Sequence, residues 1–134
     1  MAGVGFLNIF LGPMEIVIIA FLGRLSDRME IQVRGKTITS VYFSVAETAW
    51  KMEDAFLVLE YLQGLHKVVL GGDILTKTLE YTYDNWYYEP KPQKDVLFNS
   101  EHSIQWAQQY LTRYIKRNGS GYYVVFVVEN EMFL

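Results

Sequence analysis

Residues 70–92 read LGGDILTKTLEYTYDNWYYEPKP, and the strand signals in this stretch organise the rest of the chain around them. The apolar run just before it, residues 66–70, predicts a short strand. The glycines Gly71 and Gly72 then either break that strand or let another backbone approach it closely. Asp73 after two glycines is typical of a turn, because an aspartate side chain can hydrogen-bond to its own backbone.

The second half of the stretch predicts a returning strand within residues 74–86. Its alternation gives a core face with Leu79, Tyr81 and Tyr83 and an outer face with Glu80, Thr82 and Asp84. The alternation fails at Asn85 and Trp86, which predicts a bulge or a turn there. Residues 90–95 are polar and contain two prolines, which indicates a loop.

The sequence before this stretch predicts a hairpin followed by a helix. Apolar residues alternate over 29–43, and a turn signal at 34–36 divides them into two strands. The S-x-x-E pattern at 44–47 has the form of a capping box at a helix start. The apolar positions over 50–63 then fall on one helical face, so we expect a helix that ends at the glycine that follows.

The start of the chain is strongly apolar. Residues 4–22 are nearly long enough to span a membrane, but Asn8, Glu15 and a Gly-Pro break at 12–13 interrupt them. No Lys or Arg precedes them either, so a membrane anchor is disfavoured. We expect two buried elements, one on each side of the break. A homodimer contact through this segment is the other open interpretation.

The sequence after the opening stretch predicts one more helix and one more strand. Asn99 or Ser100 can cap the helix, and the Asn-Gly pair at 118–119 can stop it. Its apolar stripe consists of Ile104, Ala107, Leu111, Tyr114 and Ile115. The apolar run over 121–128 predicts a central strand that is covered on both faces. The chain is therefore expected to be one α+β domain over 1–134, with a mostly antiparallel sheet and at least two packed helices.

The composition limits the chemistry of the protein. The chain has 134 residues and a net charge of −3, which argues weakly against nucleic-acid binding. It has no cysteine, and His66 and His102 lack metal-ligand spacing, so we expect no metal and no cofactor. It also lacks nucleophile and phosphate-loop motifs, so no catalytic residue is assigned. An acid–base enzyme that uses Asp73 and Asp84 stays open, ranked after the two binding hypotheses given below.

Aromatic and acidic residues concentrate around the opening stretch. Aromatic residues make up 16% of the chain, and residues 53–101 carry nine acidic residues against four lysines. Tyr and Trp provide contact area at low entropic cost, and carboxylates attract a basic partner. We therefore predict a face that binds a basic protein surface, such as that of a nuclease. Its candidate residues are Glu80, Asp84, Trp86, Tyr87, Tyr88 and Glu89.

Several segments in a fixed order carry a family resemblance: AWKMEDAFLVLEYLQ, LGGDIL, YTYDNWYYE, AQQYLTRYI and GYYVVFVV. Together they resemble the immunity proteins of bacterial polymorphic-toxin and contact-dependent inhibition systems, in particular immunity protein family forty. The resemblance covers about residues 50–128 and divides the chain into an N-terminal part, 1–45, and a family-like part, 46–134. Gly71, Gly72 and Asp73 match the glycine-glycine-aspartate element of the family. Asp84, Asn85, Trp86 and Tyr87 match its aromatic element.

This resemblance implies a function. Such proteins are not enzymes, and each binds a cognate toxin C-terminal domain in the cytoplasm and neutralises it. We expect this chain to mask the active site of its toxin, which is a nuclease in one version of the hypothesis. The alternative from a different class is a small-ligand or regulatory binding domain, with a pocket between the helices and the sheet.

Overall fold

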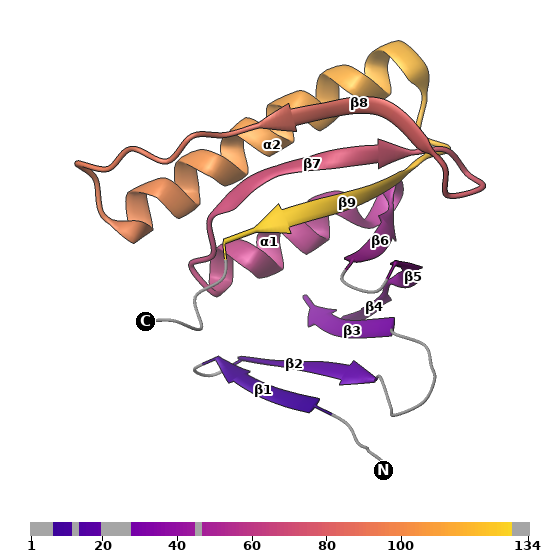
Figure 1. Cartoon of the computed structure of the whole chain (residues 1–134). Coiled ribbons are helices and arrows are strands. Elements are labelled where there is room, and N and C mark those ends of the chain that lie inside the picture. Colours follow the sequence, from indigo (N-terminus) through magenta and orange to yellow (C-terminus); the bar gives the residue numbers. More distant parts are fainter. Residues whose placement is uncertain (1–6, 12–13, 20–27, 45–46, 130–134) are drawn as a thin grey trace.

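The computed structural model describes residues 7–11, 14–19, 28–44 and 47–129, which form two antiparallel sheets and two α-helices (Figure 1). The expected α+β fold, with a mostly antiparallel sheet and two packed helices, is thus confirmed. The strands are β1 (Leu7–Leu11), β2 (Met14–Ile19), β3 (Arg28–Val33), β4 (Lys36–Thr39), β5 (Val41–Ser44), β6 (Glu47–Lys51), β7 (Val69–Leu75), β8 (Tyr81–Tyr87) and β9 (Tyr123–Val128). The helices are η1 (Met52–Asp54), α1 (Ala55–Gly64) and α2 (Val96–Asn118).

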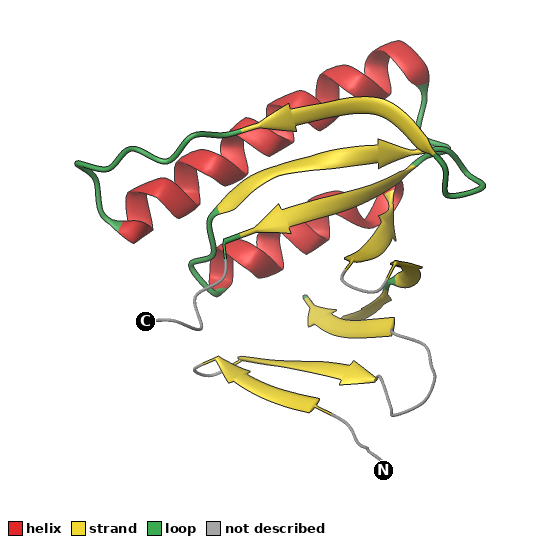
Figure 2. Ribbon diagram, in the orientation of Figure 1, coloured by secondary structure: helices red, strands yellow, loops and turns green. Residues whose placement is uncertain are grey.

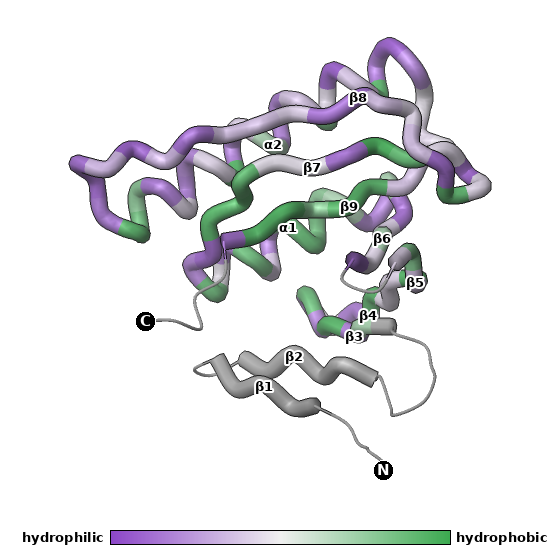
Figure 3. Tube along the Cα trace, viewed as in Figure 1, coloured by the Kyte–Doolittle hydropathy of each residue, from purple (hydrophilic) through white to green (hydrophobic). Residues whose placement is uncertain are grey.

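The larger sheet has the strand order β5-β6-β9-β7-β8, so β9 lies in the middle and β8 at an edge. Both α-helices lie against the same face of β7, β8 and β9 (Figure 2). There the helices share one core with sheet residues such as Val69, Ile74 and Val124. Along the chain β9 is mostly hydrophobic, whereas β8 is pale or hydrophilic (Figure 3). The central place predicted for β9 is confirmed, whereas its predicted cover on both faces is wrong, because Val127 is exposed.

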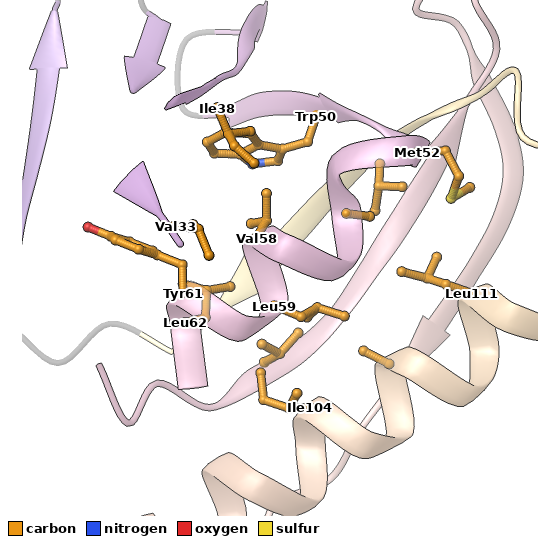
Figure 4. Close-up of a cluster of buried hydrophobic side chains, with 14 of the residues drawn as sticks. Val33, Ile38, Trp50, Met52, Val58, Leu59, Tyr61, Leu62, Ile104 and Leu111 are labelled. Atoms are coloured by element: carbon orange, nitrogen blue, oxygen red, sulfur yellow. The ribbon is translucent and has the colours of Figure 1, made fainter. Parts of the chain in front are cut away.

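The hairpin of β3 and β4 packs against α1. Its two-residue turn uses Arg34 at φ 52° and Gly35 at φ 76°, which is the conformation that joins antiparallel strands without splaying them. Val33 and Ile38 point toward the side chains of α1 (Figure 4). The Arg34 Nε atom donates to Glu60 Oε2 of α1 at 2.8 Å. The turn predicted at 34–36 is therefore confirmed.

Strands β1 and β2 pair with each other and extend the hairpin into a four-stranded sheet of order β1-β2-β3-β4. The two elements expected near the start of the chain are thus strands. The break at 12–13, residues 20–22 and the burial of this segment's side chains lie outside the described residues. Neither α1 nor α2, the α-helices of the described part, is long and apolar enough to cross a membrane.

The capping box predicted at 44–47 is wrong, because Glu47 begins strand β6 and not a helix. Ser44 Oγ donates to Glu47 Oε1 at 3.2 Å instead of capping a backbone amide. Trp50 pairs with Val124 of β9, and its buried ring joins the core. The sheet partner and the burial of Trp50 outweigh the local helix signal. Helix α1 begins only after η1 and ends at the expected glycine.

The cap predicted for α2 is also wrong. The carboxylate of Asp95 caps the helix and accepts a hydrogen bond from the Phe98 amide at 2.9 Å. Asn99 and Ser100 are buried within the first turns, where Asn99 bonds to the preceding loop. The end of the helix is as predicted, since Gly119 follows it at φ 87°.

Candidate functional site

The two motif segments of the sequence lie opposite each other as strands β7 and β8. Gly71 pairs with Tyr87, Gly72 with Trp86, and Asp73 with Asn85. Strand β7 continues through both glycines, so the break and the turn predicted at 71–73 are wrong. The close backbone approach, which was the other interpretation of the glycines, is confirmed. The two segments are therefore halves of one structural unit.

The close approach lies between the glycines of β7 and Trp86 of β8. A Cβ atom on Gly72 would overlap the Trp86 ring, and one on Gly71, at φ 157°, would collide with the Trp86 carbonyl oxygen. Trp86 is only 8% exposed and stacks on Tyr110 of α2, with ring centroids 5.0 Å apart. Phe126 of β9 meets it edge-on at 6.0 Å. Trp86 thus joins β8 to α2 and belongs to the core.

Tyr88 also lies inside the protein, with 2% of its surface exposed. Its hydroxyl donates to Asn99 Oδ1 at 3.0 Å and contacts His102 Nδ1 at 3.1 Å. Since the Asn99 oxygen can only accept, we assign the proton of the second contact to the histidine. Burial raises the pKa of Tyr88. Asn99 further bonds to the backbone N and O of Lys91, so this cluster fastens the β8–α2 loop to the helix.

The opposite side of β7 and β8 carries exposed residues. Side chains alternate along a strand. Because Trp86 packs against α2, its neighbours Asn85 and Tyr87 point away from the helices. Tyr87 is 67% exposed, and the exposed Asn85 lies beside its half-buried partner Asp73. We call the surface formed by Asp73, Tyr81, Asn85 and Tyr87 the outer face.

Tyr81 lies among carboxylates at one end of the outer face. It pairs with Leu75 of β7, and its ring meets Phe43 of β5 edge-on at 5.3 Å. Partial burial, followed by the negative charges of Glu47 and Asp73, raises the pKa of Tyr81. The phenol of Tyr81 thus sits in a local field that is negative.

Tyr83 occupies a bulge in β8. The ladder skips there, so that residues 82–84 lie opposite Ile74 alone. Tyr83 has φ 70° and is 83% exposed. The core positions predicted for Tyr81 and Tyr83 are wrong, and the bulge lies earlier than predicted. Trp86 takes the core side because it buries more apolar surface, whereas a tyrosine fits either a dry or a wet face.

The four carboxylates of the opening stretch lie in different places. Glu80 precedes β8 and Glu89 follows it, and both are exposed. Asp84 accepts a hydrogen bond from Tyr114 of α2 at 2.8 Å, so it lies on the helix side, whereas Asp73 lies on the outer face. Burial, together with this hydrogen bond, raises the pKa of Tyr114 to about 12. Asp73 and Asp84 therefore do not converge as the carboxylates of an acid–base enzyme would.

Trp106 of α2 is a site residue that the sequence interpretation missed. The Tyr88 amide bonds to Leu70 of β7, so by alternation the Tyr87 carbonyl points away from β7. Trp106 Nε1 donates to that carbonyl at 3.1 Å and covers part of the free edge of β8. The signal for this arrangement is a ring at every fourth position of the helix: Phe98, His102, Trp106, Tyr110 and Tyr114.

A second candidate site is a cavity of about 390 Å³ between α1 and strands β3, β6 and β9. Its lining is mostly apolar and includes Ile31, Trp50, Val58, Leu62 and Phe126. In the part of the chain that the structure describes, no three His, Asp or Glu side chains come together to hold a metal ion. The mostly apolar lining suits the cavity to an apolar ligand and not to a metal ion.

An exposed aromatic and acidic sheet face on a rigid scaffold suits a protein that binds another protein. The family model of immunity protein 40 matches residues 40–128, and the chain belongs to this family. The resemblance seen in the sequence is thereby confirmed. Searches of curated proteins and of solved structures return no match. Immunity proteins neutralise toxins and are typically not enzymes, so membership implies toxin neutralisation in general and a cognate toxin as the partner.

Proposed function

We propose that this protein binds the C-terminal domain of its cognate toxin in the cytoplasm and covers the active site or substrate groove of that domain. The observation that carries the proposal is the exposed outer face with its flanking carboxylates, in a chain that belongs to an immunity protein family. Masking requires only complementary contact. The proposed function therefore involves no catalytic residue and no cofactor of this chain.

The proposed contact residues divide into two groups. Glu80, Tyr87 and Glu89 are exposed, and Asp84 is exposed too but lies on the helix side, where Tyr114 binds it. Trp86 and Tyr88, which the sequence grouped with them, are buried, so they hold β8 in place and do not touch the toxin. The motif residues Gly71, Gly72, Asp73 and Asn85 hold β7 and β8 in register, and Asp73 and Asn85 also lie on the outer face.

The charge around β8 favours a basic partner. Residues 78–90 contain three carboxylates and neither Lys nor Arg. Such a surface attracts a cationic protein surface and repels phosphate, so it disfavours nucleic acid as the direct partner. A nuclease has a cationic surface where it engages its substrate, and we therefore propose a nuclease as the toxin class.

The test is neutralisation and co-purification with the toxin C-terminal domain encoded beside this chain. We expect the two proteins to form a stable complex and the complex to lack toxin activity. A mixture in which the toxin domain stays active and unbound contradicts the proposal. Loss of DNA or RNA cleavage in the complex supports the nuclease assignment, and a toxin domain that cleaves neither contradicts that finer part.

The small-ligand domain is the second candidate, and the cavity of about 390 Å³ is the observation that favours it. Mass spectrometry of the natively purified protein separates the two candidates. A stoichiometric small molecule, together with no effect on the toxin domain, would favour the ligand-binding function. A ligand-free protein that neutralises the toxin supports the leading proposal.

Self-association through residues 4–22 is a separate proposal from the sequence, based on the apolar character of that segment. Sedimentation of the free protein at several concentrations tests it. A dimer that a polar substitution at Ile9 or Ile16 converts into a monomer supports it, and a monomer at all concentrations contradicts it.

A further inference from the structure

Tyr83 combines high exposure with an unfavourable backbone conformation. Its φ of 70° lies in the left-handed region, which residues with bulky side chains seldom adopt. Its side chain is 83% exposed, so burial of the ring among the described residues does not offset this conformational cost. Bulges of this kind re-aim a side chain and occur often at functional sites, and local strain is retained where it serves function.

The bulge is held from several sides. Thr82 Oγ1 donates to the Ile74 carbonyl of β7 at 2.8 Å and accepts from the Asp84 amide at 3.0 Å. The Asp84 carboxylate is bound in turn by the Tyr114 hydroxyl of α2. The residues on both sides of Tyr83 are therefore fixed to the scaffold. Such preorganisation lowers the entropy lost when a partner binds the exposed ring.

The surroundings of Tyr83 define the chemistry that it can recognise. The ring of Tyr81 lies beside it, with centroids 6.1 Å apart and an interplanar angle of 33°. Glu80 precedes the two rings in sequence, the carboxylates of Glu47 and Asp73 act on Tyr81, and residues 78–90 carry no cation. Aromatic faces attract ammonium and guanidinium groups, and carboxylates pair with them. The pair of rings is therefore suited to a Lys or Arg side chain.

The edge of β8 is less suited to a partner that adds a strand. Trp106 occupies the carbonyl of Tyr87, and the bulge at residues 82–84 interrupts the regular spacing of backbone groups. A strand added to an edge needs a continuous row of free donors and acceptors. Contact through side chains is therefore favoured over pairing of backbones.

We propose that Tyr83 is the anchor of the toxin contact and that its ring, beside Tyr81, receives a basic side chain from the toxin domain. This inference rests on the proposed function and deepens it, because it names the central contact and the chemistry of its counterpart. The anchor is a residue that lies outside the contact residues predicted from the sequence, which placed it on the core face.

The test is the affinity of Tyr83→Ala for the purified toxin domain, measured by calorimetry beside the wild-type protein. We expect a loss of at least about 30-fold, as for a central aromatic contact. Tyr42→Ala is the matched control, because Tyr42 is also an exposed tyrosine, at 45%, on β5. The ring of the next residue, Phe43, contacts Tyr81 of the outer face, so by alternation Tyr42 points away from that face. We expect this control to stay within about 3-fold of the wild type.

Two further variants separate contact from folding. Tyr83→Phe keeps the ring and should retain most of the affinity, whereas Tyr83→Asn tolerates the left-handed conformation and loses the ring. For Tyr83→Asn we expect a midpoint of urea unfolding that is equal to or higher than that of the wild type, together with the same loss of affinity. A fall in both stability and affinity would instead assign Tyr83 a folding role and overturn the inference.

The remaining outcomes are also decisive. If the wild type binds the toxin domain and Tyr83→Ala binds equally well, the anchor is wrong while the proposed function stands. If the wild type itself does not bind, both are overturned. If Tyr83→Ala changes the sedimentation of the free protein, the ring serves contact between copies of this chain, and the assignment to the toxin is wrong.

Discussion

At the residue scale, the packing of β7 against β8 depends on one contact, in which Gly72 has no side chain and the Trp86 ring fills the space. Gly72 of β7 leaves room for the Trp86 ring of β8, and Tyr110 of α2 stacks on that ring. A glycine in a strand normally weakens it, because it adds backbone entropy and offers nothing to pack. Here the loss is offset by the burial of a tryptophan, whose apolar surface is the largest of any side chain.

Gly72→Ala should destabilise the fold by about 1–3 kcal/mol, because the new methyl group forces the Trp86 ring out of its place. Urea unfolding followed by tryptophan fluorescence measures the change. Gly121→Ala is the control, since a Cβ atom there meets nothing within 4 Å and the φ of Gly121 is not positive. Equal stability of the two variants would contradict the role assigned to Gly72.

The bond between Tyr114 and Asp84 predicts a pH dependence at the alkaline end. The pKa of Tyr114 is raised to about 12 in the folded protein, above the ordinary value of 10. The neutral phenol is thus favoured by folding, so its contribution is complete below pH 10 and is lost as the pH rises toward 12. Tyr114→Phe should therefore show a shallower loss of unfolding free energy over this range than the wild type. Parallel curves for the two proteins would contradict the assignment.

At the scale of elements, the outcome depends on whether a signal is local or lies in distant parts of the chain. The hairpin turn at Arg34 and Gly35, the end of α2 and the central strand β9 follow from residues that are neighbours in sequence. These elements were predictable. Strand β6 was not, because its pairing with β9 joins segments more than 70 positions apart.

The candidate site was predictable in its location and less so in its details. The sequence indicated an aromatic and acidic segment, and that segment forms β8 and its flanks. It could not show which parity faces the helices, because Trp86 and the tyrosines compete for the same core and Gly72 decides in favour of the tryptophan. It also could not place Tyr83, since a bulge is set by the partner strand.

The cap of α2 provides a prediction with an internal control. Asp95→Ala removes a side-chain hydrogen bond to the Phe98 amide and should lower the unfolding free energy by about 1 kcal/mol. Asp54→Ala removes an aspartate from the same position of α1, where it makes no capping bond, so only the weaker effect of the helix dipole is lost there. Chemical denaturation of both variants measures the difference. A larger effect of Asp54→Ala would contradict the assigned cap.

At the scale of the whole molecule, charge and hydrophobicity are segregated. Apolar side chains of the hairpin, the helices and the larger sheet build the interior, whereas residues 78–90 around β8 carry three carboxylates and no cation. Negative charge near the contact accelerates encounter with a basic partner and is screened by salt. Neutralisation of the toxin should therefore depend on ionic strength mainly through the rate of association.

The double variant Glu80→Gln with Glu89→Gln should slow association with the toxin domain by about 3- to 10-fold at low salt and change the dissociation rate little. Stopped-flow mixing at several NaCl concentrations measures both rates. Glu30→Gln on β3 is the control, because Glu30 is exposed but lies on the smaller sheet. An effect of the control that is as large per charge removed would mean that net charge, and not the position of the two glutamates, governs encounter.

The bulge of β8 also has a consequence for engineering. The ladder is fixed on both sides of residues 82–84 by regular pairing with β7, and Thr82 ties the interval to the scaffold. The exposed side chain at position 83 can therefore be changed without altering the residues that determine the fold. A library of side chains at this single position, with Thr82 retained, would be a compact starting point for retargeting the protein to related toxins without redesigning its core.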